Sequence, residues 1–206
     1  MIDKKQYKYM NKKELNAELL DACAKGHLDI AQYLLTSPEL KEHANIYHQD
    51  TGGWNALMVA CYYGNLTIVK YLLTSSELKE NVNIHDKNNY GSNVLMFACA
   101  RGYLDIVKYL LTSPELKEHV DIYHKDNYGD NALISSCVNE HLDIVEYLVI
   151  DMNMKVDENT KHWLQGNNDN EIVYEDTLKL IKTRDLHQKV DSSVNVNNKK
   201  SNTIKV

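Results

Sequence analysis

The sequence lacks several features that assign a chain to a class at first sight. It has no run of about 18 apolar residues, the minimum for a membrane-spanning helix. Its first residues, Met1 to Gln6, are polar and lack the apolar core of a signal peptide. On these grounds we expect no spanning helix and no secretory leader. We therefore expect a protein of the reducing cytoplasm or nucleus, with no membrane contact.

The short motifs that carry catalysis are also missing. The chain contains no G-x-S-x-G, no Walker phosphate loop, no G-x-G-x-x-G and no H-E-x-x-H. These motifs supply a nucleophile, a phosphate cradle, a dinucleotide turn or a pair of zinc ligands. We therefore expect no enzymatic activity and no cofactor.

Positive charge is scarce in the body of the chain. There are two arginines against 21 lysines, and the net charge is −6. The first 13 residues carry +4 and residues 189–206 carry +3, so residues 14–188 carry −13. Because an acidic body repels phosphate backbones, nucleic acid is not expected as the main ligand.

What the sequence does contain is one stretch written four times. Asn55–Gly64 returns as Asn93–Gly102 and as Asn131–Cys137, and Leu19–Gly26 is a blunter copy. The four cysteines, at positions 23, 61, 99 and 137, are each 38 residues apart. A constant period of this size predicts an array of repeats in which each repeat contacts its neighbours.

Each repeat predicts two short antiparallel helices, and in the last three a tight turn precedes them. An Asp or Asn followed three residues later by Gly opens the turn, because glycine permits a positive φ. Asparagines are expected to cap the first helices at Asn55, Asn93 and Asn131. These first helices should end near Gly26, Gly64, Gly102 and Glu140. Apolar residues at helical spacing then predict the second helices, as in Leu66–Leu73.

A Thr-Ser-Pro-Glu-Leu-Lys-Glu segment follows the first of these second helices, with copies at 74–80 and 112–118. Ser37–Glu39 has the signature of a helix start, so we expect a short extra helical turn there that braces one edge. Beyond Ile150 the period fails. A shortened helix is expected over 160–165, and a longer amphipathic helix over 171–188 should cover the last hydrophobic face.

These units resemble the ankyrin repeat. The family pattern D-x-x-G-x-T-P-L-H-x-A-A-x-x-G-H-x-x-I-V-x-x-L-L runs through Asp50–Leu73, and much of it returns in the next two units. The matches in this stretch are Asp50, Gly53, Leu57, Ala60, Gly64, Ile68, Val69, Leu72 and Leu73. Two departures stand out. Asn55–Met58 replaces the T-P-L-H tetrad, so the usual Thr–His hydrogen bonding is absent, and the period is 38 instead of about 33 residues.

The resemblance implies an all-α ankyrin solenoid of helix-turn-helix repeats of 38 residues with short hairpin turns. We expect a flexible leader over 1–11, an ankyrin repeat domain over 12–189 and a disordered tail over 190–206. The expected repeats are 12–49, 50–87, 88–125 and 126–157, followed by a helical cap over 158–189. The long repeat and the Asn/Lys bias are similar to ankyrin proteins multiplied in giant DNA viruses of amoebae, which would place the chain in a host cytoplasm or nucleus. No F-box-like segment follows Trp163.

The resemblance also implies a non-catalytic module that binds a partner protein through the concave side. This side comprises the hairpin tips and the exposed inner side of the first helices, which we call the recognition face. The candidate partner-binding residues on it are Trp54, Tyr62, Tyr63, Tyr90, Arg101, Tyr128, Asp130 and Asn139. Trp, Tyr and Arg dominate binding hot spots. Tyr90 and Tyr128 occupy equivalent positions, so packing between neighbouring hairpins is the competing explanation for them.

The cysteines and histidines predict packing in preference to a metal site. Helices stack about 8–10 Å apart, whereas zinc needs each sulfur at about 2.3 Å and a disulfide needs Cα atoms within about 6.8 Å. Equivalent cysteines therefore meet neither requirement, and we expect them to act as small apolar core residues. The histidines recur two or three repeats apart, which is typical of structural positions. No metal is expected.

Two alternative functions remain open from the residues. A targeting or substrate adaptor, including a host-directed viral effector, would recruit a second factor through the basic termini. A structural protein would self-associate through an incompletely capped end, whereas we expect a monomer. For the protein-binding module, Trp54→Ala with Tyr63→Ala is expected to weaken partner capture and leave the thermal midpoint nearly unchanged.

Overall fold

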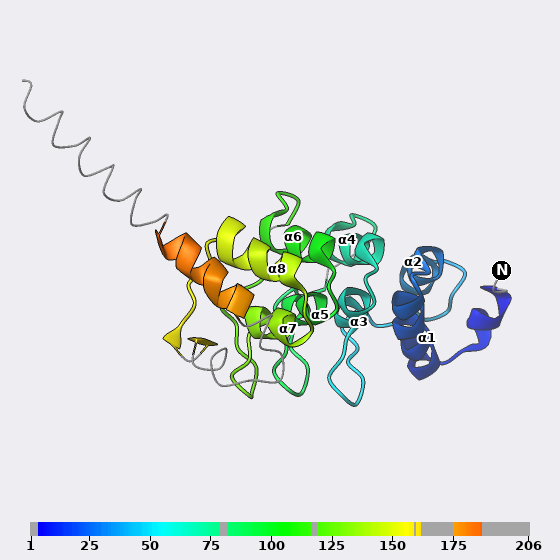
Figure 1. The fold of residues 1–206 in the computed structure, drawn as a ribbon. Helices are drawn as coiled ribbons and strands as arrows, with labels where there is room; N and C mark the ends of the chain where they lie inside the picture. The colour runs from blue at the N-terminus through cyan, green and yellow to red at the C-terminus, as the bar shows by residue number, and fades with distance from the viewer. Residues whose placement is uncertain (1–3, 79–81, 117–118, 159, 162–174, 187–206) are drawn as a thin grey trace, which may run out of the picture. The chain divides into compact units, whose positions relative to one another are not determined.

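The computed structural model describes residues 4–78, 82–116, 119–158, 160–161 and 175–186 (Figure 1). The chain divides into two compact units, residues 1–141 and 142–206. Helices supply the regular structure of both units, and no strand occurs within the described ranges. The all-α prediction is therefore confirmed.

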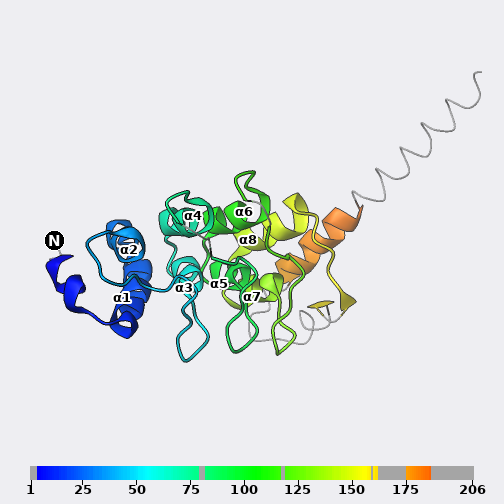
Figure 2. The ribbon, with the colours of Figure 1, turned by 180° about the vertical axis from the view of Figure 1, so that it is seen from behind.

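The first unit has its α-helices in two layers (Figures 1 and 2). The first layer consists of α1 (Lys12–Lys25), α3 (Ala56–Tyr62), α5 (Val94–Ala100) and α7 (Ala132–Val138). The second layer consists of α2 (Leu28–Thr36), α4 (Leu66–Thr74) and α6 (Leu104–Thr112). Helices pack along each layer, α1 on α3 on α5 on α7 and α2 on α4 on α6, and the members of each consecutive pair also pack together. This is the arrangement of stacked helix pairs that the 38-residue period predicts.

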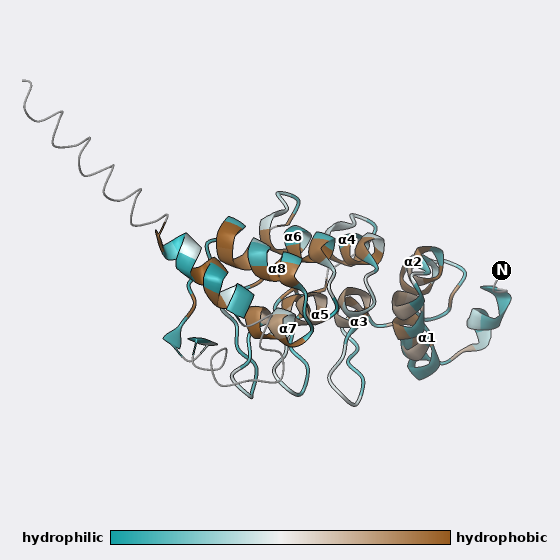
Figure 3. Ribbon diagram, in the orientation of Figure 1, coloured by the Kyte–Doolittle hydropathy of each residue, from teal (hydrophilic) through white to brown (hydrophobic). Residues whose placement is uncertain are grey.

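Apolar residues concentrate on the helices and polar residues on the hairpins and loops (Figure 3), and the buried hydrophobic side chains of the core come mainly from the helices. Leu57, Leu95 and Leu133 occupy the same position in α3, α5 and α7, and each is at most 1% exposed. Burying a leucine side chain contributes about 1.5–3 kcal/mol. The equivalent positions along the first layer therefore supply much of the driving force for stacking.

The four cysteines lie in this core. Cys23, Cys61, Cys99 and Cys137 are all free thiols and fully buried. Burial raises the pKa of Cys23 and of Cys99 to about 12, because the interior disfavours a thiolate. The expectation that they pack as small apolar residues is confirmed.

Asparagine side chains begin the first helices, as expected. The Oδ1 atoms of Asn55, Asn93 and Asn131 accept the backbone N–H three residues later, at 3.0–3.1 Å. Asn55 has a second use, because its Nδ2 donates to Asp86 Oδ2 at 2.9 Å in the next hairpin region. A single asparagine thus caps its helix and links two repeats, in the place where the family pattern has threonine.

The first helices end where the sequence predicts. Gly64 and Gly102 have φ of 80° and 78°, and a Cβ atom on either would meet a ring of the next repeat, Tyr103 or His141. We call each of these positions a glycine notch. Glu140 occupies the corresponding place in the fourth repeat and adopts φ 61°. This position therefore carries a side chain where the second and third repeats have none.

The leader differs from the expected flexible segment. Lys4–Tyr9 form a 3₁₀ helix, η1, and the Tyr7 side chain is 1% exposed with its ring centroid 6.1 Å from that of Tyr33 in α2. Lys8 Nζ also lies 2.8 Å from Glu39 Oε2. One buried tyrosine fixes the segment, and a single apolar residue leaves no periodicity to detect. The prediction was wrong for residues 4–9, and residues 1–3 lie outside the described residues.

The extra turn expected at Ser37–Glu39 is present as a single hydrogen-bonded turn and does not extend into a helix. Leu40 N–H donates to Ser37 O at 3.2 Å and closes a single turn, and the chain then returns to α2 through Ala44 N–H, which donates to Leu34 O at 3.0 Å. The side chain of Leu40 is buried and anchors this loop. The early return to α2 leaves no room for the consecutive hydrogen bonds of a helix.

The second unit begins with α8 (Leu142–Glu146), which continues as a π-helix, η2 (Tyr147–Asp151). The expected helix over 171–188 is present where it is described, at 175–186, although Leu186 on its predicted apolar face is 64% exposed. Within this unit Arg184 donates to the backbone oxygen of Met154. The segments 162–165 and 190–206, expected as a helix and a disordered tail, lie outside the described residues.

Candidate functional site

Three hairpins project side by side from the α3, α5 and α7 row, on the side away from α4 and α6 (Figures 1 and 2). Each is closed by an Asp or Asn side chain whose Oδ1 accepts the backbone N–H groups two and four residues later. These three residues are Asp50, Asn88 and Asp126. The predicted turn chemistry is confirmed by this pattern.

Hydrogen bonds join each hairpin tip to the next. Asn89 donates its backbone N–H to Gly52 O at 3.1 Å and its Nδ2 to Thr51 O at 2.9 Å. Asn127 does the same one repeat later, to Tyr90 O at 3.0 Å and Asn89 O at 3.2 Å. The tips therefore form a fixed row, against which side chains of the recognition face are positioned.

Four of the predicted residues come together with a fifth as one aromatic cluster. Trp54 stacks on Phe97 with ring centroids 4.2 Å apart and meets Tyr62 edge-on at 5.3 Å. Tyr62 contacts Tyr63 edge-on at 5.1 Å, and the guanidinium carbon of Arg101 lies 4.7 Å from the Tyr62 ring centroid. Tyr63 and Arg101 are exposed, whereas Trp54 and Tyr62 are half-buried. The cluster thus exposes the Arg101 guanidinium and the Tyr63 ring to solvent, while Trp54, Tyr62 and Phe97 pack beneath them.

Phe97 was missed by the sequence reasoning. It is the single phenylalanine of the chain and is 8% exposed, at a position where the second and fourth repeats have Val59 and Ser135. A comparison of equivalent positions shows this change of size, which is the signal that was available. Its ring supports Trp54 and sets how far the tryptophan projects.

Tyr90 and Tyr128 form a second aromatic group at the hairpin tips. Their ring centroids are 6.4 Å apart with 27° between the planes, and the residues are 55% and 74% exposed. They do pack on each other, as the competing explanation held. Most of each side chain nevertheless stays in solvent and accessible to a partner.

Asp130 and Asn139 join neither group through a side-chain contact in the described part of the chain. Asp130 is half-buried, and burial, with a smaller effect of Asp126, raises the pKa of its carboxyl group. The Asn139 Nδ2 donates to Ser135 O at 2.9 Å at the end of α7. The fourth repeat therefore presents polar groups where the second presents aromatic ones.

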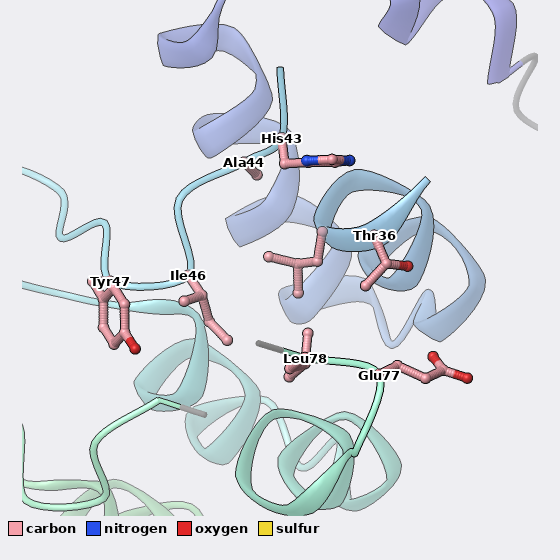
Figure 4. Close-up of a pocket in the computed structure, with 8 residues that line it drawn as sticks. Thr36, His43, Ala44, Ile46, Tyr47, Glu77 and Leu78 are labelled. Carbon is pink, nitrogen blue, oxygen red and sulfur yellow. The ribbon is translucent and has the colours of Figure 1, made fainter. Parts of the chain in front are cut away.

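A separate hollow of about 480 Å³ lies away from the hairpins, between the loop after α2 and the turn after α4 (Figure 4). Ile46 and Leu78 approach each other from the two loops, and His43 and Glu77 lie at the rim. The His43 Nε2 is 2.9 Å from Ser37 O, so this ring is held by the backbone. Half of the described lining is aliphatic, and the hydroxyl group of Thr36 donates to Gln32 O at 2.8 Å.

All four thiols are buried, and no group of three or more His, Cys, Asp or Glu side chains suited to a metal ion occurs in the described residues. Among the described helices, none has the length and apolar character needed to cross a bilayer.

Comparison with protein families gives a direct match. The family model described as "Ankyrin repeats (3 copies)" matches residues 10–86 and 76–161, which together span most of the chain. The chain belongs to the ankyrin repeat family. Ankyrin repeats are generally protein–protein interaction modules and are typically non-catalytic. No individual curated protein matches the chain.

Proposed function

We propose that this ankyrin repeat protein binds a partner protein through its recognition face and catalyses no reaction. The observation that supports this most strongly is the aromatic cluster at the junction of the second and third repeats. Surface aromatic side chains and arginine bury a large area on binding while keeping a polar group for hydrogen bonding. Here they are positioned in advance by packing, so little side-chain entropy is lost when a partner binds.

Tyr63 and Arg101 are the best residues for testing the proposal. Both are exposed, so their loss removes contact area without opening the core. Trp54 is a poorer choice because it stacks on Phe97, and we now expect Trp54→Ala to lower the thermal midpoint in addition to weakening binding. This revises the expectation that the midpoint stays nearly unchanged in the Trp54→Ala, Tyr63→Ala double variant.

The test is affinity capture from cell extract with the full chain, the Tyr63→Ala/Arg101→Ala variant and Tyr9→Ala as a matched control. Tyr9 is 90% exposed and lies in η1, outside the recognition face. We expect a set of proteins retained by the wild type and the Tyr9 variant and lost with the double variant. Identical retention by all three proteins would contradict the proposal.

The adaptor alternative predicts a different result in the same experiment. If the basic tail recruits the partner, deletion of residues 190–206 removes the retained proteins and the Tyr63→Ala/Arg101→Ala variant keeps them. The assignment to a host-directed viral protein stays a prediction, as do the cytoplasmic location and the monomeric state. Light scattering of the purified full chain measures the last of these directly.

A further inference from the structure

The hairpin that opens the fourth repeat carries a carboxylate without a side-chain partner. Asp130 donates its backbone N–H to Asp126 Oδ1 at 3.1 Å, but its own carboxylate forms no hydrogen bond or ion pair with the described residues. The group is half-buried, and the burial raises its pKa. A negative charge that is partly desolvated and lies beside a second carboxylate gains from an added cation.

Two exposed rings lie at the same hairpins. The Tyr128 N–H donates to Asp126 Oδ1 at 2.9 Å, so one side chain holds both Tyr128 and Asp130 in a single turn. The Tyr128 ring stacks with the Tyr90 ring. The whole Tyr128 residue is 74% exposed. An aromatic face carries negative potential, which attracts cations. The turn therefore carries, two residues apart, an exposed ring and a half-buried carboxylate, each of which favours a cation.

The recognition face already holds one guanidinium in this manner. Arg101 stacks its guanidinium 4.7 Å from the Tyr62 ring centroid. This internal contact shows that a tyrosine on this face accepts a planar cation. The net charge of −13 over residues 14–188 adds attraction for a positively charged segment.

We infer that the fourth-repeat end of the recognition face takes an arginine side chain of the partner, stacked on Tyr128 and paired with Asp130. Arginine fits better than lysine because its guanidinium is planar, stacks on rings and is weakly hydrated. The partner segment would then run from an arginine at this end to an apolar side chain on the aromatic cluster. The inference rests on the proposed function, since it specifies the partner of the same face.

The test uses random linear peptides displayed as a library and selected on the full-length protein. Synthetic copies of the selected peptides are then titrated by fluorescence anisotropy against the wild type, Asp130→Asn and Tyr128→Ala. Asp105→Asn is the charge-matched control, because Asp105 is exposed on α6, and Tyr9→Ala is the aromatic control. Thermal unfolding verifies that each variant is folded.

We expect the selected peptides to contain arginine in preference to lysine. Asp130→Asn and Tyr128→Ala should each weaken their binding by about tenfold, the size of one desolvated cation–aromatic or ionic contact. An arginine-to-lysine change in the peptide should weaken binding to the wild type and have a smaller effect on either variant. The two controls should bind like the wild type.

Other outcomes separate the two proposals. Peptides that lack arginine, or whose affinity is unaffected by Asp130→Asn and Tyr128→Ala, overturn the inference. If the same peptides are weakened by Tyr63→Ala with Arg101→Ala, the proposed function stands. Failure of the wild type to select any peptide, or binding that none of these variants alters, contradicts both.

Discussion

Among single residues, Glu140 adopts a backbone conformation that its counterparts reach without strain. Gly64 and Gly102 end their helices at φ of 80° and 78°, where glycine is at ease, and Glu140 sits at 61°. A left-handed conformation costs an ordinary residue about 1–2 kcal/mol. Glycine loses about 0.5–1 kcal/mol of extra freedom on folding, which offsets part of any gain from replacement.

We therefore predict that Glu140→Gly raises the free energy of unfolding by about 0.5–1 kcal/mol. Urea denaturation followed by circular dichroism measures it. Gly102→Ala is the opposite control, because its Cβ would meet the His141 ring and its φ is positive, so it should destabilise the protein. An unchanged or lower stability for Glu140→Gly would show that the glutamate side chain makes a contact that compensates for the strain.

The buried thiols make stability depend on pH. Burial raises the pKa of Cys23 and of Cys99 to about 12 from 9.0, so the unfolded chain releases these protons first as the pH rises. Their contribution is fully present below about pH 9 and is lost between pH 9 and 12, at about 1.4 kcal/mol per pH unit for each thiol.

We predict that urea midpoints fall steeply above about pH 9, and that a thiol reagent at neutral pH labels the native protein much more slowly than the unfolded one. Replacing Cys23 and Cys99 with alanine should flatten the alkaline fall. Rapid labelling of all four thiols in the native protein would mean that the core opens frequently.

The sequence predicts recognition-face residues better than it predicts how they contact one another. Asn55 could be assigned as a cap because a cap depends on residues three positions apart. Trp54 on Phe97 depends on two repeats meeting, and the spacing alone does not show which side chain fills the gap. The stacking of Arg101 on Tyr62 likewise depends on two repeats meeting, and the sequence does not show it.

Among the elements, η1 contacts α2 in the way that one second helix contacts the next. Lys4 Nζ lies 5.3 Å from the Tyr33 ring centroid in α2, and Lys70 Nζ in α4 lies 5.2 Å from that of Tyr109 in α6. The same lysine–tyrosine contact thus closes the first repeat and joins later ones. The leader covers a face of α2 that would otherwise be exposed to solvent.

We predict that Tyr7→Ala lowers the free energy of unfolding by about 3 kcal/mol, because it deletes a fully buried ring. Tyr9→Ala in the same helix is the matched control, since Tyr9 is 90% exposed, and it should change stability by less than about 0.5 kcal/mol. Chemical denaturation measures both. Equal effects of the two changes would show that η1 does not pack on α2 in solution.

Elements were predictable in proportion to how often they recur. The helix pairs repeat with the 38-residue period, so their apolar spacing was read several times over. The 3₁₀ helix at Lys4–Tyr9 and the π-helix at Tyr147–Asp151 each occur once among the described residues and are set by individual contacts and backbone hydrogen bonds, whereas the single turn at Ser37 returns at Ser75 and Ser113. At Ser37 the Ser-Pro-Glu pattern of a helix start gave the position of a turn and overstated its length.

At the scale of the whole molecule, folding brings the negative charges of the repeat body close together. Residues 14–188 carry −13, and ion pairs such as Lys25–Asp21 and Lys8–Glu39 are exposed. Exposed pairs contribute little, so repulsion between carboxylates is only weakly compensated. Like charges held together in a folded chain destabilise it.

We predict that the thermal midpoint rises with salt, as the Debye length falls from about 30 Å at 0.01 M to about 3 Å at 1 M. The rise should be about 2–4 °C for each kcal/mol of repulsion removed. The control is the same series near the isoelectric point, where the salt dependence should be much flatter. A midpoint that falls with salt at neutral pH would mean that ion pairs outweigh repulsion.

The glycine notches limit the positions at which further repeats can be added to the array. A duplicated copy of residues 88–125, inserted before the original, would seat its tyrosine at Gly64 and offer its own glycine to Tyr103. The same copy placed after the fourth repeat would meet Glu140, which carries a Cβ atom at the position where a Cβ on Gly64 or Gly102 would meet the neighbouring ring. Gene duplication is therefore expected to lengthen this array from within, and the fourth repeat acts as a barrier to tyrosine-bearing copies beyond it.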